Sequence, residues 1–88
     1  MIQVILNKDD YEFIIEKAPS FLTEVEAKPA KITDSKVMYL FNTEKDYDDF
    51  ESGFNFTIVH DGLDNQDTSN DIGMRLYHIY DSMEVYEQ

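Results

Sequence analysis

The chain has 88 residues, and its nineteen Asp and Glu residues against seven Lys and Arg give a formal net charge of −12. Nucleic-acid binding relies on Lys and Arg to displace counterions from phosphates, so this balance excludes a nucleic-acid-binding protein. An anionic membrane surface would repel the chain for the same reason. The chain has no cysteine, which excludes disulfides and zinc–thiolate sites. We expect a single cytoplasmic domain over residues 1–88, because the length fits one domain and no apolar run approaches the roughly 20 residues that span a bilayer.

The beginning of the chain predicts a strand followed by a helix. Residues 2–6 are rich in β-branched side chains and contain no breaker, which is typical of a strand. Asn7 can cap a following helix, and two aspartates fall in its first turn, where the positive end of the helix dipole favours carboxylates. Apolar residues then recur at helical spacing up to Pro19, so we predict a helix over residues 8–18.

Two further strands are predicted before residue 43. Between residues 21 and 27 apolar and polar side chains alternate, a pattern that favours a strand with one solvated face. Pro29 follows, and it restricts the pairing of this segment to a sheet edge or a turn. A turn at residues 33–35 then leads into residues 36–42, whose β-branched and aromatic side chains predict another strand.

The segment 44–61 admits two interpretations. As a helix, it begins after the N-cap residue Thr43 and ends at Gly62, because glycine suits the left-handed conformation that often follows a helix. As an alternative, Gly53 could break the element so that residues 54–60 form a strand. The helix is favoured because both end signals agree with an apolar stripe at helical spacing. That stripe consists of Tyr47, Phe50, Phe54 and Ile58.

The last third of the chain predicts an exposed loop and a terminal helix. Residues 64–70 contain no apolar side chain, which indicates a loop. Residues 71–86 carry an apolar stripe at helical spacing and predict a helix, on which Asp71 and Arg75 would form a weak local ion pair. The stripe consists of Ile72, Leu76, Ile79, Met83 and Tyr86. All elements together predict an α+β fold with a short antiparallel sheet and about three helices.

No arrangement of residues predicts an enzyme, a cofactor or a metal site. The two histidines, His60 and His78, lie in no recognised catalytic motif. Carboxylates are too numerous in this chain for any one pair to indicate acid–base catalysis. An EF-hand loop requires a glycine at position 6 and a glutamate at position 12. The acidic stretch that begins at Asp61 lacks both residues, whether the loop starts there or at Asp64.

The negative charge is concentrated in the second half of the chain. Residues 1–44 carry five basic residues against eight acidic ones, whereas residues 45–88 carry two against eleven. On a helix over 44–61, the aromatic Phe56 would be exposed beside carboxylates, and an apolar anchor within a charged rim is typical of a protein interface. We therefore predict a partner-binding surface that consists of Asp46, Asp48, Asp49, Glu51, Phe56, Asp61, Asp64, Asp67 and Asp71.

The size and composition of the chain resemble those of phage-encoded nucleic-acid mimics, small acidic proteins that inhibit nucleic-acid-binding enzymes. This resemblance implies an inhibitor or regulator of the phage or mobile-element type, whose carboxylates stand in for backbone phosphates on a basic surface of its protein partner. The alternative is a structural or assembly module that forms a homodimer through Phe13, Phe56 and Val85, while the acidity serves only solubility.

Overall fold

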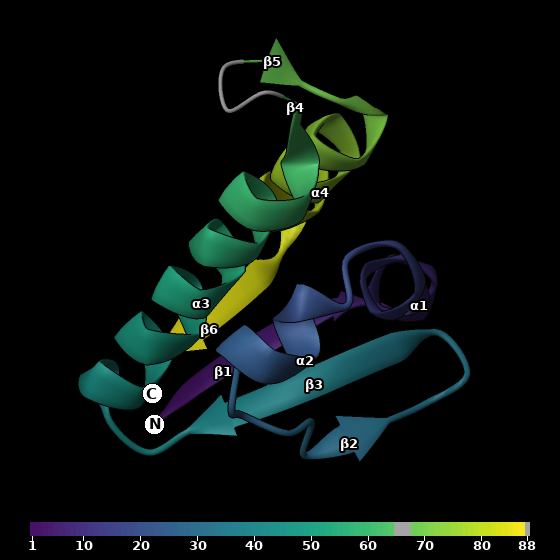
Figure 1. Cartoon of the computed structure of the whole chain (residues 1–88). Helices are drawn as coiled ribbons and strands as arrows, with labels where there is room; N and C mark the ends of the chain where they lie inside the picture. Colours follow the sequence, from purple (N-terminus) through teal and green to yellow (C-terminus); the bar gives the residue numbers. More distant parts are fainter. Residues whose placement is uncertain (65–67, 88) are drawn as a thin grey trace.

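The chain forms an antiparallel sheet with helices packed on one of its faces (Figure 1). The computed structural model describes residues 1–64 and 68–87. In chain order the elements are β1 (Ile2–Asn7), α1 (Lys8–Lys17), α2 (Ser20–Glu24), β2 (Lys31–Ile32), β3 (Lys36–Phe41), α3 (Glu44–Gly62), β4 (Leu63–Asp64), β5 (Thr68–Ser69), α4 (Asp71–Ser82) and β6 (Glu84–Glu87). The predicted α+β class is confirmed. None of the helices in the described ranges is long and apolar enough to cross a membrane.

The four-stranded sheet has the order β2-β3-β1-β6, and every pairing in it is antiparallel. β1 pairs with β3 along its whole length, from Ile2 opposite Phe41 to Asn7 opposite Lys36, and with β6 on its other side. Successive side chains of β1 and β3 point to opposite faces, and one face is buried while the other is partly or fully exposed. All four helices contribute buried side chains to the same core as the buried sheet face. The opposite face of the sheet is therefore left uncovered by helices.

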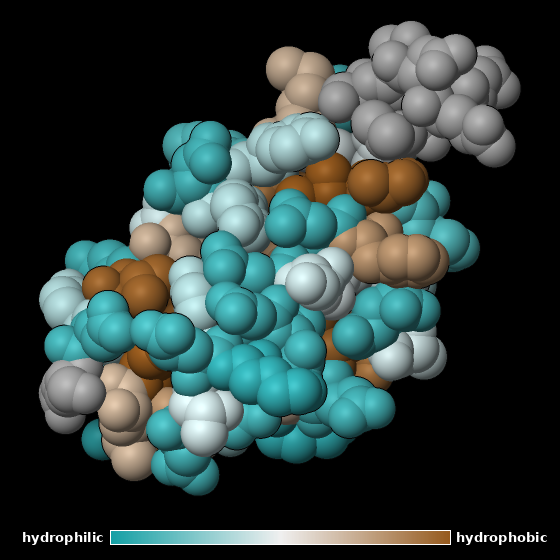
Figure 2. Space-filling view, turned by 90° about the vertical axis from the view of Figure 1, so that its left-hand side faces the viewer, coloured by the Kyte–Doolittle hydropathy of each residue, from teal (hydrophilic) through white to brown (hydrophobic). Residues whose placement is uncertain are grey.

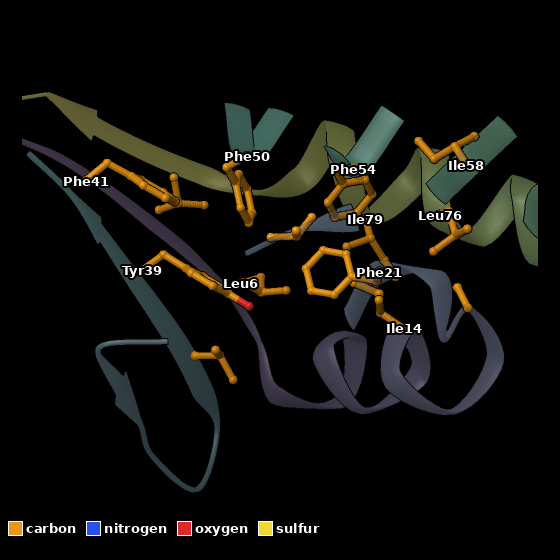
Figure 3. Packing of buried hydrophobic residues seen from close by; sticks show 14 of the residues in the cluster. Leu6, Ile14, Phe21, Tyr39, Phe41, Phe50, Phe54, Ile58, Leu76 and Ile79 are labelled. Atoms are coloured by element: carbon orange, nitrogen blue, oxygen red, sulfur yellow. The ribbon is translucent and has the colours of Figure 1, made fainter. Parts of the chain in front are cut away.

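Aromatic side chains make up the centre of the core (Figure 3). Phe50 of α3 lies over the inward face of β3, with ring centroids 5.0 Å from Tyr39 and 5.2 Å from Phe41. On the side toward α2, the edge of the Phe21 ring meets Phe54 at a centroid distance of 5.6 Å. Offset and edge-to-face pairs of this kind stabilise beyond the area that they bury. The rings thus join α3 to both the sheet and α2.

The glycines lie where α3 approaches its neighbours too closely for a side chain. A Cβ atom on Gly53 would lie 2.5 Å from the carbonyl oxygen of Glu24 and 2.8 Å from a methyl group of Val25. At the last residue of α3, a Cβ on Gly62 would lie 2.6 Å from the Cα of Gly73 in α4. Gly62 belongs to the helix and does not adopt the left-handed conformation that its position suggested. These glycines are therefore required for close helix packing.

The strand predicted over residues 2–6 and the helix predicted over residues 8–18 are confirmed as β1 and α1, and the strand over residues 36–42 is confirmed as β3. The N-cap interaction of Asn7 is absent. Its side chain makes no capping bond, and its Oδ1 instead accepts a hydrogen bond from Lys36 Nζ at 2.8 Å. That contact supports the adjacent end of the β1–β3 ladder.

The helix predicted over residues 44–61 is confirmed as α3. Thr43 Oγ1 accepts a hydrogen bond from the Asp46 backbone N–H at 3.1 Å, as an N-cap residue does. The predicted stripe faces the core. The alternative strand over residues 54–60 is wrong, because Thr57 is buried within the helix and donates its hydroxyl to the Gly53 carbonyl at 3.0 Å.

The strand predicted over residues 21–27 is wrong. Residues 20–24 form α2, and residues 25–30 lie outside regular structure. Phe21 and Val25 are four residues apart, and such residues share a face in a strand and in a helix alike. Both are buried in the core. The short alternating pattern was therefore ambiguous, and packing of the Phe21 ring against α3 favours the helical turn.

The helix predicted over residues 71–86 begins correctly but ends at Ser82. Asn70 caps it, since its side chain accepts a hydrogen bond from the Gly73 N–H at 2.8 Å. Met83 is extended, and the next four residues pair with β1 as β6. Val85 and Tyr86 are residue types that suit a strand. Pairing with β1 supplies backbone hydrogen bonds across the sheet. These bonds favour the strand, although the apolar residues also have the spacing of a helix.

We expect Gly53→Ala to lower the free energy of unfolding by about 1–3 kcal/mol, although alanine is the better helix former. The added Cβ would lie 2.5 Å from the Glu24 carbonyl oxygen, a backbone atom that cannot rotate away. Urea unfolding followed by circular dichroism measures the change. The matched control is Ser52→Ala at the neighbouring exposed position, which should change stability by no more than about 0.5 kcal/mol. A stabilised Gly53→Ala variant would contradict the close approach.

Candidate functional site

The solvent-facing side of α3 carries carboxylates near its start and apolar side chains toward its end. Asp48, Asp49 and Ser52 are exposed there, and Phe56 and Val59 follow at helical spacing on the same side. The side chains of Phe56 and Val59 are 50% and 59% exposed, although both are apolar. These five residues form the α3 surface.

The α3 surface combines charge with small apolar areas. Figure 2 shows the side of the molecule on which α3 lies in Figure 1, and hydrophilic residues on it surround separate hydrophobic patches. The Phe56 ring is stacked on the His60 imidazole, with centroids 6.0 Å apart and planes 18° from parallel. Aromatic anchors with a polar rim are the usual anatomy of a protein interface. The arrangement can therefore offer an apolar contact within an acidic field.

Two of the predicted partner-binding carboxylates are bonded inside the fold. Glu51 Oε2 accepts a hydrogen bond from the Tyr80 hydroxyl at 2.7 Å, which links α3 to α4 and raises the pKa of that phenol. Asp61 Oδ2 accepts hydrogen bonds from the Ser20 hydroxyl at 2.5 Å and from the Ser20 backbone N–H at 3.3 Å, which links α3 to α2. Both carboxylates therefore already serve to join helices, which the fully exposed acids of α3 do not.

Asp61 is held in its ionised form by its neighbours. Burial acts to raise its pKa, but hydrogen bonds from Ser20 and from His60 Nδ1, 3.2 Å away, outweigh burial. The pKa of Asp61 consequently lies below its ordinary value of 3.8. His60 thus occupies the last turn of α3 and contacts a carboxylate there.

The other predicted carboxylates are spread over several elements. Asp46 is exposed in the first turn of α3, and Asp71 is exposed in the first turn of α4. Asp64 belongs to β4, and Asp67 lies outside the described residues. The structure therefore brings together Asp46, Asp48 and Asp49 as exposed acids within about one helical turn.

One of these three acids already has a cationic neighbour. Lys45 Nζ lies 2.9 Å from Asp49 Oδ2, and both side chains are mostly exposed. The carboxylate raises the pKa of Lys45 through their hydrogen bond. Solvent screens an exposed pair of this kind, so it opposes a competing cation only weakly.

A groove of about 630 Å³ lies between α2 and the segment that follows it, the end of β3, and the start of α3. Its lining includes the carboxylates Glu24, Glu26, Asp46 and Asp49, together with apolar residues of β3 and α3. We name it the edge groove, because β3 borders it. The sequence did not indicate this groove, since its walls come from three segments that are far apart in the chain.

The ion pair predicted between Asp71 and Arg75 is wrong. Arg75 Nη2 instead contacts Oδ1 of the buried Asp10 at 2.9 Å, and the guanidinium lies 4.8 Å from the centroid of the Phe13 ring. Phe13, which the homodimer hypothesis treated as exposed, is partly buried and packs against the core. Asp10 precedes Ile14 by four residues and so shares its inward face. That spacing is the only signal in the sequence for the pair.

The described part of the chain contains no group of three or more His, Cys, Asp or Glu residues placed to hold a metal ion. No protein-family model matches this chain, and no curated protein or solved structure is significantly similar to it. The features of the molecule that bear on its function are therefore the α3 surface and the edge groove.

We expect Arg75→Met to lower the free energy of unfolding by about 1–3 kcal/mol, because it leaves the buried Asp10 carboxylate without its charged donor. Urea unfolding at neutral pH measures the loss. Lys45→Met removes an exposed ion pair and should leave the free energy of unfolding nearly unchanged. Combining Arg75→Met with Asp10→Asn should recover part of the loss, since no buried charge remains. An Arg75→Met variant as stable as the Lys45→Met control would contradict the assignment.

We expect Asp61→Asn to be less stable than the unchanged protein at pH 7, with the difference shrinking as the pH falls. The folded-state pKa of Asp61 is lowered, so its ionisation stabilises the fold above the unfolded value near 3.8, and the stabilisation is lost as the pH falls through the folded value. Urea unfolding between pH 7 and pH ~2.5 covers this window. Asp48→Asn, on the exposed face, controls for the loss of one charge. A difference that does not depend on pH would contradict this prediction.

Proposed function

We propose that the chain is a small protein-binding protein, an inhibitor or regulator of the phage or mobile-element type, that docks on a basic surface of a partner. The observation that supports this most directly is the placement of exposed Phe56 and Val59 on the same face of α3 as the exposed carboxylates Asp48 and Asp49. Charged groups at the rim steer association and determine its specificity, whereas buried apolar anchors carry most of the binding energy.

The net charge supports the choice of a basic partner. A charge of −12 on 88 residues produces a field that attracts a Lys- or Arg-lined surface over about one Debye length, roughly 10 Å at moderate salt. A nucleic-acid-binding enzyme presents such a surface. The partner proposed is therefore a basic protein, and the chain itself needs no direct contact with nucleic acid or membrane.

The internal bonds of Glu51 and Asp61 refine the comparison with nucleic-acid mimics. Because both are bonded to other elements, the exposed carboxylates on α3 are concentrated in its first two turns. The exposed carboxylates of α3 therefore form a short acidic cluster with an apolar area next to it, and not a long row of phosphate surrogates. We propose a mixed interface, in which the acids align the partner and Phe56 is the anchor.

Self-association is the competing function, and the exposed edge strand β6 favours it. Val85 and Tyr86 are 44% and 47% exposed on this strand. An open edge strand is a common template for pairing with another chain. Light scattering over a range of concentrations decides between the two functions, because a mass that stays at one chain of 10.3 kDa excludes the homodimer.

To test the proposed function, the immobilised chain is exposed to a bacterial lysate at low salt, and bound proteins are eluted with rising salt. We expect basic proteins to elute as ionic strength increases, because the interface depends on exposed charges. The triple variant Asp46→Asn, Asp48→Asn and Asp49→Asn should release them at distinctly lower salt, and Phe56→Ala should weaken capture without changing the net charge.

The matched control is the triple variant Asp9→Asn, Glu12→Gln and Glu16→Gln, which removes three exposed acids from α1. It should retain capture better than the α3 triple variant. Equal losses in the two variants would show that only the net charge matters and would refute the α3 surface. Capture that does not change with salt would refute a basic partner.

A further inference from the structure

Where β3 borders the edge groove, no strand among the described residues lies beside it on the groove side. β1 pairs with all six residues of β3, whereas β2, on the other side, pairs only with Val37 and Met38. The ladder on that side ends where the Ala30 N–H donates to the Met38 carbonyl at 2.8 Å. Backbone groups alternate between the two sides of a strand, so the N–H and C=O of Leu40 point to the same side as that carbonyl. No described residue pairs with Leu40 on this side.

The opposite wall of the edge groove also offers backbone groups without partners. Residues 26–28 line the groove or adjoin it, and they make no backbone hydrogen bond to any described residue. In Figure 1 the segment between α2 and β2 runs beside the end of β3. Unpaired N–H and C=O groups along a sheet edge are the template on which an extended peptide adds as a further strand.

The side chains around the edge groove specify the charge of such a peptide. Among the described residues, the charged side chains that line it are the acids Glu24, Glu26, Asp46 and Asp49 and the cation Lys28. The apolar part of the lining includes Leu40, whose side chain is 43% exposed, and the buried rings of Phe41 and Phe50. Lys and Arg side chains match this combination, because their aliphatic stems pack on apolar surface while their charged ends stay in water or meet carboxylates.

We infer that the edge groove binds an extended segment of the partner containing Lys or Arg, which adds as a short strand beside Leu40. The groove volume of about 630 Å³ lies within the range of built ligand sites, roughly 300–1,000 Å³. About three extended residues span the roughly 10 Å needed to continue the sheet past Met38. Asp49 belongs both to the groove and to the α3 surface, so one partner can reach both. The inference rests on the proposed function only in taking the partner to be basic.

The test uses an acetylated and amidated peptide, Lys-Val-Lys-Val-Lys, with the complete 88-residue chain. We expect the peptide to slow hydrogen exchange of the Leu40 amide by more than about tenfold, because that N–H gains a partner. Chemical shifts of backbone amides should move most around residues 24–28 and 40–42. A second peptide has the same sequence but is N-methylated at alternate residues, on the edge that faces β3. It should not slow exchange of the Leu40 amide, because it cannot form the hydrogen bonds of the ladder.

Charge variants then separate the groove from the general acidity of the chain. Glu24→Gln combined with Glu26→Gln should weaken binding of the peptide by about three- to tenfold, the range expected for two exposed charge contacts. Glu84→Gln combined with Glu87→Gln removes the same charge from β6, at the opposite edge of the sheet, and should leave binding nearly unchanged. A peptide with Glu in place of Lys should not bind.

Three results would overturn the inference: no slowing of exchange at Leu40, equal binding of the N-methylated peptide, or equal loss in the two double variants. Failure of the groove is distinguishable from failure of the proposed function. Phe56→Ala should weaken capture of the basic partner but leave binding of the peptide unchanged, because Phe56 does not line the groove. Capture that depends on Phe56, together with a peptide that does not bind, would refute only the groove.

Discussion

The close packing of α3 is the constraint on which the rest of the structure depends. Gly53 lets the helix approach the carbonyl oxygen of Glu24, and Gly62 meets Gly73 of α4 with almost no space between the backbones. From the same helix, Phe50 and Phe54 fill the centre of the core (Figure 3). Because one face of α3 is buried against neighbouring elements, only its opposite face can meet solvent or a partner. The acidic and apolar residues of the α3 surface lie there as a consequence.

The distribution of carboxylates follows from the same packing. An acid on the boundary of the α3 core face meets another helix and is bonded by it, as Glu51 is by Tyr80 and Asp61 is by Ser20. Acids on the outer face are exposed, and one of them, Asp49, is paired with an exposed lysine. A charge is costly to bury unless it is paired and hydrogen-bonded. The carboxylates therefore divide into those that join helices and those that remain available for a partner.

The edge groove and the absence of the strand predicted over residues 21–27 have the same structural cause. Residues 21–24 turn into a helix because Phe21 packs on α3, and the segment after α2 then passes the end of β3 without pairing to it. A third full-length strand on that side would have closed the edge. In its absence no described strand pairs with Leu40 toward the groove, and carboxylates of α2, of the segment after it and of α3 line the same groove. A ligand surface thus arises from the competition between helix packing and strand pairing.

The sequence by itself determined the fold class, β1, α1, β3 and α3, because strong local patterns and end signals such as Thr43 agree with the final packing. It also located the exposed acids of α3 and the outward position of Phe56. Tertiary structure alone decided α2, β6, the Asp10–Arg75 pair and the edge groove. Residues four apart share a face in a helix and in a strand, so Phe21 and Val25 could not reveal their conformation. The partners of β6 and Arg75 lie more than sixty residues away, and no local spacing records contacts that only folding brings together.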